Sequence, residues 1–320
     1  MNKVLTYLCA LGGVVSSLLT SCSFQNIVTP DKTTPSYVAL EVNSGRVLYA
    51  SNSNIKRPIG MLTNLATAVV VMDWIKAYQV DMNRLITVPE GATVWQRTNL
   101  LHLRAGDTIS VRDALYSALM WDDSACATTL AYACGSNLSS GNPEGAFIAQ
   151  MNNLARRLGM TSTVFKGSNG AVITQSSARD MALLGMYAIN DTDLMAITAQ
   201  TGCIVTIHSP SGIRKQTIRN NNKLLSGSGH VDGLKAGQSR SAGSCLMVTA
   251  RRASVKRANP VTGKESTYAQ RLLVVMLGMP SSNTRYKEAA RFLRDGWNAW
   301  DAWLPTNDYK DRTKFIILPN

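Results

Sequence analysis

The chain has 320 residues, and one of its few pairs spaced as a nucleophile and its base is Ser53 with Lys56. On a helix, this three-residue spacing brings two side chains to one face, about 5–6 Å apart at Cβ. The amine can then take the hydroxyl proton. Ser53 and Lys56, however, lie in a polar run ahead of Arg57 and Pro58. That context indicates a loop, so the pair lacks the helix that the chemistry needs.

The spacing of the titratable residues does not indicate a metal or cofactor site. The three histidines, His102, His208 and His230, are isolated along the chain. No Cys/His spacing typical of a metal site occurs either. We therefore expect no metal and no other cofactor.

The hydrophobic pattern predicts strands at both ends of the chain and helices between them. Residues 37–49 alternate around Asn43-Ser44-Gly45, which indicates a β-hairpin. Residues 62–75 are apolar on all sides, as in a buried central helix. Further helices are predicted over residues 111–120, 126–134, 146–158, 178–189 and 286–300, and further strands over residues 244–250 and 271–277.

Six short segments, in this order along the chain, resemble the serine-type D-alanyl-D-alanine carboxypeptidases, the low-molecular-weight penicillin-binding proteins. They are residues 41–49 (EVNSGRVLY), 158–165 (LGMTSTVF), 177–182 (SARDMA), 220–225 (NNNKLL), 231–237 (VDGLKAG) and 242–246 (AGSCL). The resemblance implies an α+β fold of the β-lactamase/DD-peptidase type, with an antiparallel sheet flanked by helices and an all-helical lobe. It also implies an active site built from three motifs.

The first motif of that family, Ser-x-x-Lys, is lost in this chain. The family places its nucleophilic serine and basic lysine at the start of the buried helix. The corresponding residues are Met61 and Asn64. A thioether has no proton to lose and forms no acyl-enzyme, and a neutral amide is no base near pH 7.

The second and third motifs are also degenerate. The resemblance places Ser-x-Asn at residues 121–123, where Trp121 replaces the hydroxyl and Asp123 replaces the amide. In the third motif, Lys-Thr-Gly, Lys235 and Gly237 are kept, but Ala236 lacks the hydroxyl. No catalytic residue set of the family is intact. Lys235, Gly237, Asp123 and Trp121 are the candidates to line what is left of the cleft.

The first residues predict export and a lipid anchor. Lys3 is followed by an apolar stretch and then by Leu19-Thr20-Ser21-Cys22, which is typical of a bacterial lipoprotein signal. We expect a signal peptide over residues 1–21, lipid on Cys22, a tether over 22–36, the carboxypeptidase-like domain over 37–303 and a tail over 304–320. The predicted location is the periplasmic face of the bacterial cell envelope, and neither membrane is favoured over the other.

Four cysteines are left after Cys9 leaves with the signal and Cys22 takes the lipid. Cys126 and Cys134 lie eight residues apart on one predicted helix, about 12 Å, which is too far for a disulfide. Cys203 and Cys245 lie in strand-like runs. They either pair across a sheet in an oxidising compartment or stay as buried thiols.

The positive charge of the chain indicates which kinds of partner it can bind. The formal net charge is +13, and five basic residues gather in one polar stretch: Arg251, Arg252, Lys256, Arg257 and Lys264. Such a stretch is either a solvated hairpin tip or a surface for an anionic polymer, lipid headgroups or an acidic protein. Nucleic acid is excluded by export from the cytoplasm. The expected partners are the membrane, through Cys22, and peptidoglycan peptides or another envelope protein.

Three hypotheses follow. The chain is a peptidoglycan-associated pseudoenzyme, or an active D-Ala-D-Ala carboxypeptidase that trims peptidoglycan peptides with displaced residues such as Ser124 or Thr63, or a structural lipoprotein with a vestigial cleft. For the first hypothesis we expect Lys235 to pair with Asp123, because opposite charges would then replace the family's hydrogen-bond network.

Overall fold

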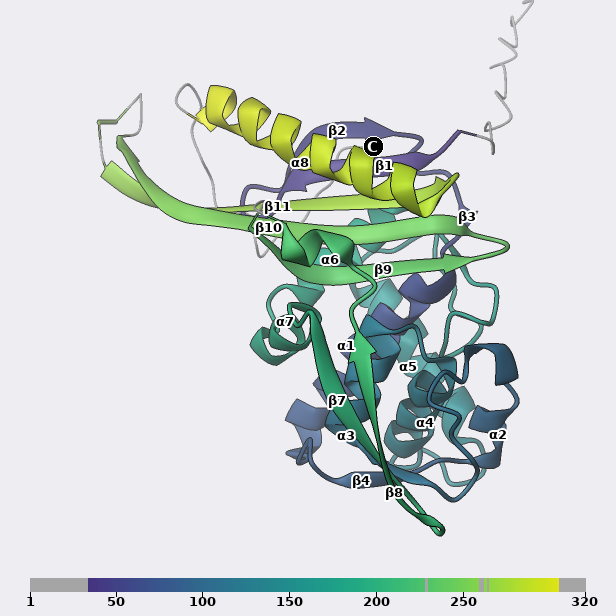
Figure 1. Ribbon diagram of the computed structural model, residues 1–320. Coiled ribbons are helices and arrows are strands. Elements are labelled where there is room, and N and C mark those ends of the chain that lie inside the picture. Colours follow the sequence, from purple (N-terminus) through teal and green to yellow (C-terminus); the bar gives the residue numbers. More distant parts are fainter. Residues whose placement is uncertain (1–33, 228–229, 259–261, 264, 305–320) are drawn as a thin grey trace, which may run out of the picture. The chain divides into compact units, whose positions relative to one another are not determined.

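A five-stranded antiparallel sheet, in the order β2-β1-β11-β10-β9, forms one layer of the protein (Figure 1). The computed structural model describes residues 34–304 except 228–229, 259–261, 264 and the side chain of Gln96. The strands of the sheet are β1 (Ser36–Glu41), β2 (Arg46–Ser51), β9 (Val231–Ser239), β10 (Gly243–Ala258) and β11 (Glu265–Met279).

Helices cover both faces of this sheet because its central strand is apolar on both sides. Along β11, Val274 and Met276 join the core beneath α8 (Ser282–Trp303), whereas Leu273, Val275 and Leu277 join the core on the other face. Successive side chains of a strand point to opposite faces, so a continuous apolar run supplies both cores. Helix α6 (Ala178–Ala188) packs on the face opposite α8 (Figure 1).

The second layer is a helical lobe built around α1. It contains α1 (Thr63–Tyr78), α2 (Glu90–Thr93), α3 (Val111–Met120), α4 (Ser124–Gly135), α5 (Pro143–Arg157) and α7 (Thr192–Thr198). The short turns η1 (Gly60–Leu62) and η2 (Gln96–Thr98) lie before α1 and after α2, and η3 (Lys223–Ser226) lies before β9. Every residue of α1 from Thr63 to Met72 is buried, so the predicted central helix is confirmed.

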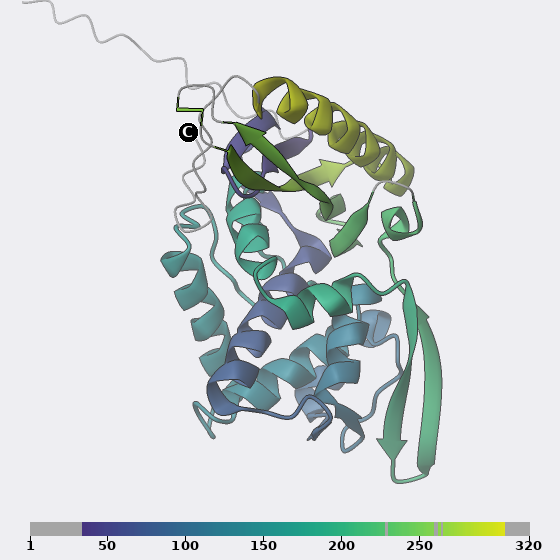
Figure 2. The same cartoon turned by 90° about the vertical axis from the view of Figure 1, so that its left-hand side faces the viewer.

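A small sheet that the sequence analysis did not predict lies beside this lobe. Its strands follow the order β4-β5-β7-β8, with bounds β4 (Leu85–Thr87), β5 (Thr108–Ser110), β7 (Gly202–Ser209) and β8 (Gly212–Arg219). The β7–β8 hairpin runs along one side of the helices (Figure 2). Two further strands, β3 (Arg57–Pro58) and β6 (Gln175–Ser176), pair with each other.

The predicted elements are present, with shifted ends. The β1–β2 hairpin forms around Asn43-Ser44-Gly45, and α3 has the predicted bounds. Strands β10 and β11 are longer than their apolar runs because the polar residues beyond them stay paired, as in Lys256↔Thr267. The predicted signal peptide, Cys22, most of the tether and the tail beyond Leu304 lie outside the described residues.

The basic stretch lies on this polar extension of β10. Two of its arginines meet carboxylates: Arg251 lies 3.4 Å from Asp232 and Arg252 lies 2.9 Å from Asp301. Lys264 lies outside the described residues. The charge of the stretch is therefore partly neutralised within the chain.

The four described cysteines are free thiols. Cys126 and Cys134 share helix α4, as predicted. Cys203 lies on β7 of the small sheet and Cys245 on β10 of the large one, so they do not face each other across one sheet. Between residues 34 and 304, no described helix is both long and apolar enough to cross a membrane.

Candidate functional site

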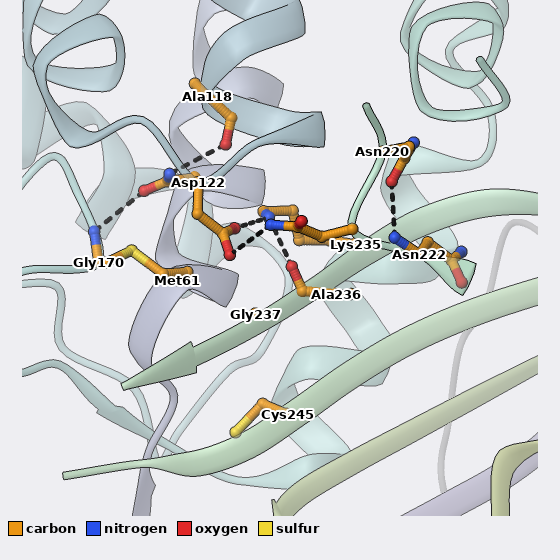
Figure 3. A network of polar contacts seen from close by, with 12 residues as sticks. Met61, Ala118, Asp122, Gly170, Asn220, Asn222, Lys235, Ala236, Gly237 and Cys245 are labelled. Carbon is orange, nitrogen blue, oxygen red and sulfur yellow. Dashed lines mark hydrogen bonds and ion pairs between the residues drawn. The ribbon is translucent and has the colours of Figure 1, made fainter. Parts of the chain in front are cut away.

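Three segments that are distant in the sequence meet where α1 begins: the η1–α1 junction, the turn between α3 and α4, and strand β9 (Figure 3). They carry the residues that stand in place of the three family motifs. The structure thus brings together the three segments that the sequence analysis grouped. What they form is a packed and hydrogen-bonded region rather than a row of reactive groups, as the individual residues show.

Met61 is enclosed by backbone. It is 6% exposed, and its sulfur accepts a hydrogen bond from the Ser124 hydroxyl at 3.9 Å. A Cβ atom on Gly170 would lie 2.6 Å from the sulfur, and one on Gly237 would lie 2.9 Å from the Met61 Cβ. Both neighbours thus approach Met61 as closely as only glycine permits. The side chain fills the position at which the family has its nucleophile.

Asn64 has become a structural cross-link. Its side-chain amide donates to the Ala118 carbonyl of α3 at 3.0 Å, and its oxygen accepts from the Gly170 N–H at 3.0 Å. The residue is fully buried, so these two bonds satisfy polar groups that solvent does not reach. Asn64 therefore joins α1 to α3 and holds the Gly170 loop over Met61.

Lys235 is fully buried and forms an ion pair with Asp122 (Figure 3). Its ammonium also donates to the Ala236 carbonyl at 2.6 Å. The second oxygen of Asp122 accepts from the Asn221 side chain at 3.1 Å. Burial lowers the pKa of Lys235, while the charge and hydrogen bond of Asp122 act in the opposite direction. The lysine is thus held in place and not free to reach a ligand.

The expected pair between Lys235 and Asp123 is wrong, because Asp123 is engaged elsewhere. Its carboxylate caps helix α4 by accepting from the Cys126 N–H at 2.8 Å, and it accepts from the Leu101 N–H at 2.8 Å. Asp is among the preferred residues at such a cap. Burial raises the pKa of Asp123, and the amide donors oppose that shift. Asp122, one residue earlier, has a φ of 66° that turns its side chain toward β9 instead.

The other residues that were predicted to line the cleft make packing contacts within the fold. Trp121 ends α3 and is half-buried against the helical core. Ala236 is 1% exposed and belongs to the core beneath α8. Gly237 lies against Met61, as described above, and its carbonyl accepts from the buried Arg285 guanidinium at 2.7 Å.

The displaced candidates lack a base. Ser124 donates to Met61, and the buried Thr63 hydroxyl has no hydrogen-bond partner within the described part of the chain. Lys235 is committed to Asp122 and Ala236, so neither hydroxyl bonds to it. Ser53 and Lys56 lie in the loop between β2 and β3, away from a helix, as the polar run predicted.

The sequence analysis missed several residues of the site. Asp122, Asn221 and Gly170 make the contacts described above, and the Tyr286 hydroxyl donates to the Asn221 carbonyl, which ties α8 into the same network. The tight helix start at Asp-Ser-Ala-Cys was a usable signal. It marks a helix cap within the run Asp122-Asp123-Ser124 but does not choose among these three residues.

Comparison with known proteins places these observations in a family context. The D-alanyl-D-alanine carboxypeptidase family model matches residues 24–266. D-alanyl-D-alanine carboxypeptidase DacC of Escherichia coli (strain K12) is 28% identical over 294 residues, which cover 88% of this chain and 65% of that protein. D-alanyl-D-alanine endopeptidase of Pseudomonas aeruginosa is 30% identical over 220 residues, 67% of this chain and 66% of that protein. The chain thus spans just under two thirds of the length of these relatives.

Solved structures agree on the fold. The crystal structure of the Streptomyces K15 DD-transpeptidase superposes with a TM-score of 0.71 at 23% identity, over 82% of this chain and 96% of that chain. D-alanyl-D-alanine carboxypeptidase DacD of Francisella tularensis has a TM-score of 0.67 at 22% identity, over 81% and 69%. The predicted fold class is confirmed, and the lobe carries the small sheet in addition to its helices.

Stability should depend on the Lys235–Asp122 pair. Replacing Lys235 by the apolar, similarly long Met leaves the Asp122 charge uncompensated, so we expect Lys235→Met to lower the free energy of unfolding by about 3–5 kcal/mol. Adding Asp122→Asn should recover part of the loss. Urea unfolding of the two single variants and the double variant measures the coupling. Additive, small changes would mean that no pair forms in solution.

Asp123 should behave as a cap with no coupling to Lys235. We expect Asp123→Ala to cost about 1–2 kcal/mol through the lost cap, and Asp123→Ser, which keeps one acceptor, to cost less. Combined with Lys235→Met, the change at Asp123 should add without interaction, in contrast to Asp122→Asn. Coupling of Asp123 to Lys235 in the same unfolding measurements would restore the original expectation.

Proposed function

The chain belongs to the D-alanyl-D-alanine carboxypeptidase family, and we propose that it is a catalytically inactive, peptidoglycan-associated lipoprotein of the bacterial cell envelope. The family resemblance inferred from the sequence is confirmed. Inactivity, lipidation and association with peptidoglycan are the parts that we propose. The two relatives compared above are named as a carboxypeptidase and an endopeptidase.

The observation that carries the proposal is the state of residue 61. The acyl transfer that the family resemblance implies needs a hydroxyl nucleophile. Met61 instead supplies a thioether, which Gly170 and Gly237 enclose. A nucleophile must also lie within hydrogen-bond reach of a base. Asn64 is neutral and Lys235 is bound to Asp122, so the position lacks the base as well as the nucleophile.

Binding without cleavage is the role that fits these changes. The fold is kept across the match, while each altered motif position makes packing or hydrogen-bond contacts of its own. The basic stretch on β10 offers a surface for acidic wall polymer or an envelope protein. The lipid on Cys22 supplies the membrane anchor, and its several acyl chains each add about 0.8 kcal/mol per buried methylene.

Penicillin should not acylate the protein. We expect no covalent adduct after incubation with a fluorescent penicillin, because the reaction needs a nucleophile that Met61 does not provide. Gel fluorescence and intact-protein mass spectrometry measure this, with an active family member as the positive control. An adduct at Ser53, Thr63, Ser124 or any other residue would overturn the proposal of inactivity.

Restoring two residues alone should not restore acylation. We expect Met61→Ser with Asn64→Lys to react little, because Trp121 and Ala236 are unchanged and catalytic residues that act as a unit are not additive. A lysine at residue 64 must also replace the amide that bridges Ala118 and Gly170. Thermal unfolding should accompany the assay, so that a folded variant without activity is distinguished from an unfolded one.

Cys22 should carry lipid. Metabolic labelling with an alkyne analogue of palmitate should mark the wild-type protein and leave Cys22→Ser unmarked, and the variant should leave the membrane fraction. Cys203→Ser is the matched control, because Cys203 is a partly buried thiol of the folded domain. If Cys22→Ser stays equally membrane-bound, the anchor is another part of the chain.

A further inference from the structure

The helical lobe contains an open hollow, whereas the region of the family's active site is filled by side chains. The hollow lies between the second half of α1, the end of α4 and the second half of α5, and its volume is about 620 Å³. That volume falls within the range of about 300–1,000 Å³ that is typical of small-molecule sites. None of the residues that line this hollow belongs to the site described above.

The walls of the hollow are mainly apolar. Val70, Trp74, Cys134 and Leu154 are buried residues that line it. At the rim, the exposed fractions of Tyr78 (55%) and Leu138 (43%) are high for large apolar residues. Scattered apolar residues on a surface need no explanation, but Tyr78 and Leu138 border the same concavity.

The polar groups of the hollow are mostly satisfied within the chain. The Trp74 indole N–H donates to the Asn137 side chain at 3.2 Å. Asp73 accepts from the Tyr187 hydroxyl at 3.0 Å, and Arg157 lies 3.5 Å from its carboxylate. The charge of Asp73 is therefore balanced by Arg157.

Arg156 is the exception. It lines the hollow, it is exposed, and its only described hydrogen bond goes to the neutral Asn153 side chain. A guanidinium presents a planar pair of donors that matches a carboxylate. The hollow thus combines an apolar wall that includes two aromatic rings with one uncompensated cation at its rim.

We propose that this hollow binds a small monoanion that has an apolar ring and one carboxylate. The ring would lie against Trp74 and Tyr78, where aromatic faces favour offset or edge-to-face contacts. The carboxylate would meet Arg156. This site is independent of the proposed loss of catalysis, because it shares no residue with the region around Met61.

The test uses 2-naphthoate as the ligand and 2-naphthol as the uncharged compound with the same ring system. The full chain, in phosphatidylcholine nanodiscs with empty nanodiscs as the blank, is titrated by isothermal calorimetry. We expect saturable binding of naphthoate, at least about tenfold tighter than naphthol, since a charge-assisted hydrogen bond supports a difference of that size.

Three variants locate the site. Ala77 is an exposed residue of α1 that lines the hollow, so Ala77→Trp should fill it and weaken both compounds at least tenfold. Arg156→Gln should weaken naphthoate by about tenfold and leave naphthol unchanged. Arg219→Gln is the matched control, because Arg219 is an exposed arginine of β8 outside the hollow, and it should change neither affinity.

Two outcomes would overturn the proposal. One is the lack of saturable naphthoate binding to the wild-type protein. The other is an equal effect of Arg156→Gln and Arg219→Gln, which would mean general attraction to a basic surface. Circular dichroism checks that Ala77→Trp is folded, and the two arginine variants decide the question if it is not.

Discussion

A buried lysine sets the main constraint on this structure. Lys235 is fully buried in β9, and an ammonium group removed from water is costly unless a counter-charge and hydrogen bonds compensate it. Asp122 supplies the charge from the α3–α4 turn. Asn221 holds the carboxylate, and Tyr286 of α8 holds Asn221 in turn. The helical lobe, the large sheet and its covering helix are thus coupled through one charge.

The replacements at two of the family's motif positions, residues 61 and 64, depend on each other. Asn64 bonds to the Gly170 N–H, and Gly170 approaches Met61 so closely that a side chain there would strike the sulfur. The amide at residue 64 therefore holds the loop that encloses residue 61. A lysine at 64 would lose this acceptor, and a serine at 61 would leave unfilled space beneath the loop. The replacements at residues 61 and 64 consequently form one alternative packing arrangement, linked through Gly170.

Much of the fold could be predicted from the sequence, because hydrophobic period and turn residues act locally. The α1 helix, the β1–β2 hairpin and the bounds of α3 follow from such patterns. The polar extension of β10 and β11 could not be predicted from apolar runs, since backbone pairing continues there without apolar side chains. At the site, the segments were predicted but one partner was wrong. Sequence spacing cannot distinguish two adjacent aspartates. Only the geometry of the helix cap shows that Asp123 caps α4 and that Asp122 does not.

The same reasoning explains why the hollow had no signal in the sequence. Its lining comes mainly from the later parts of three helices, and the pattern of one helix taken alone does not show a concavity. Concavity arises only from the way in which α1, α4 and α5 pack. Met61 and Lys235 lie at the opposite end of α1 and on β9, so the residues that fill the family's site are separate from those that line the hollow. None of the replaced motif residues lines the hollow, so a ligand site in the helical lobe does not depend on whether the family's catalytic groups are present.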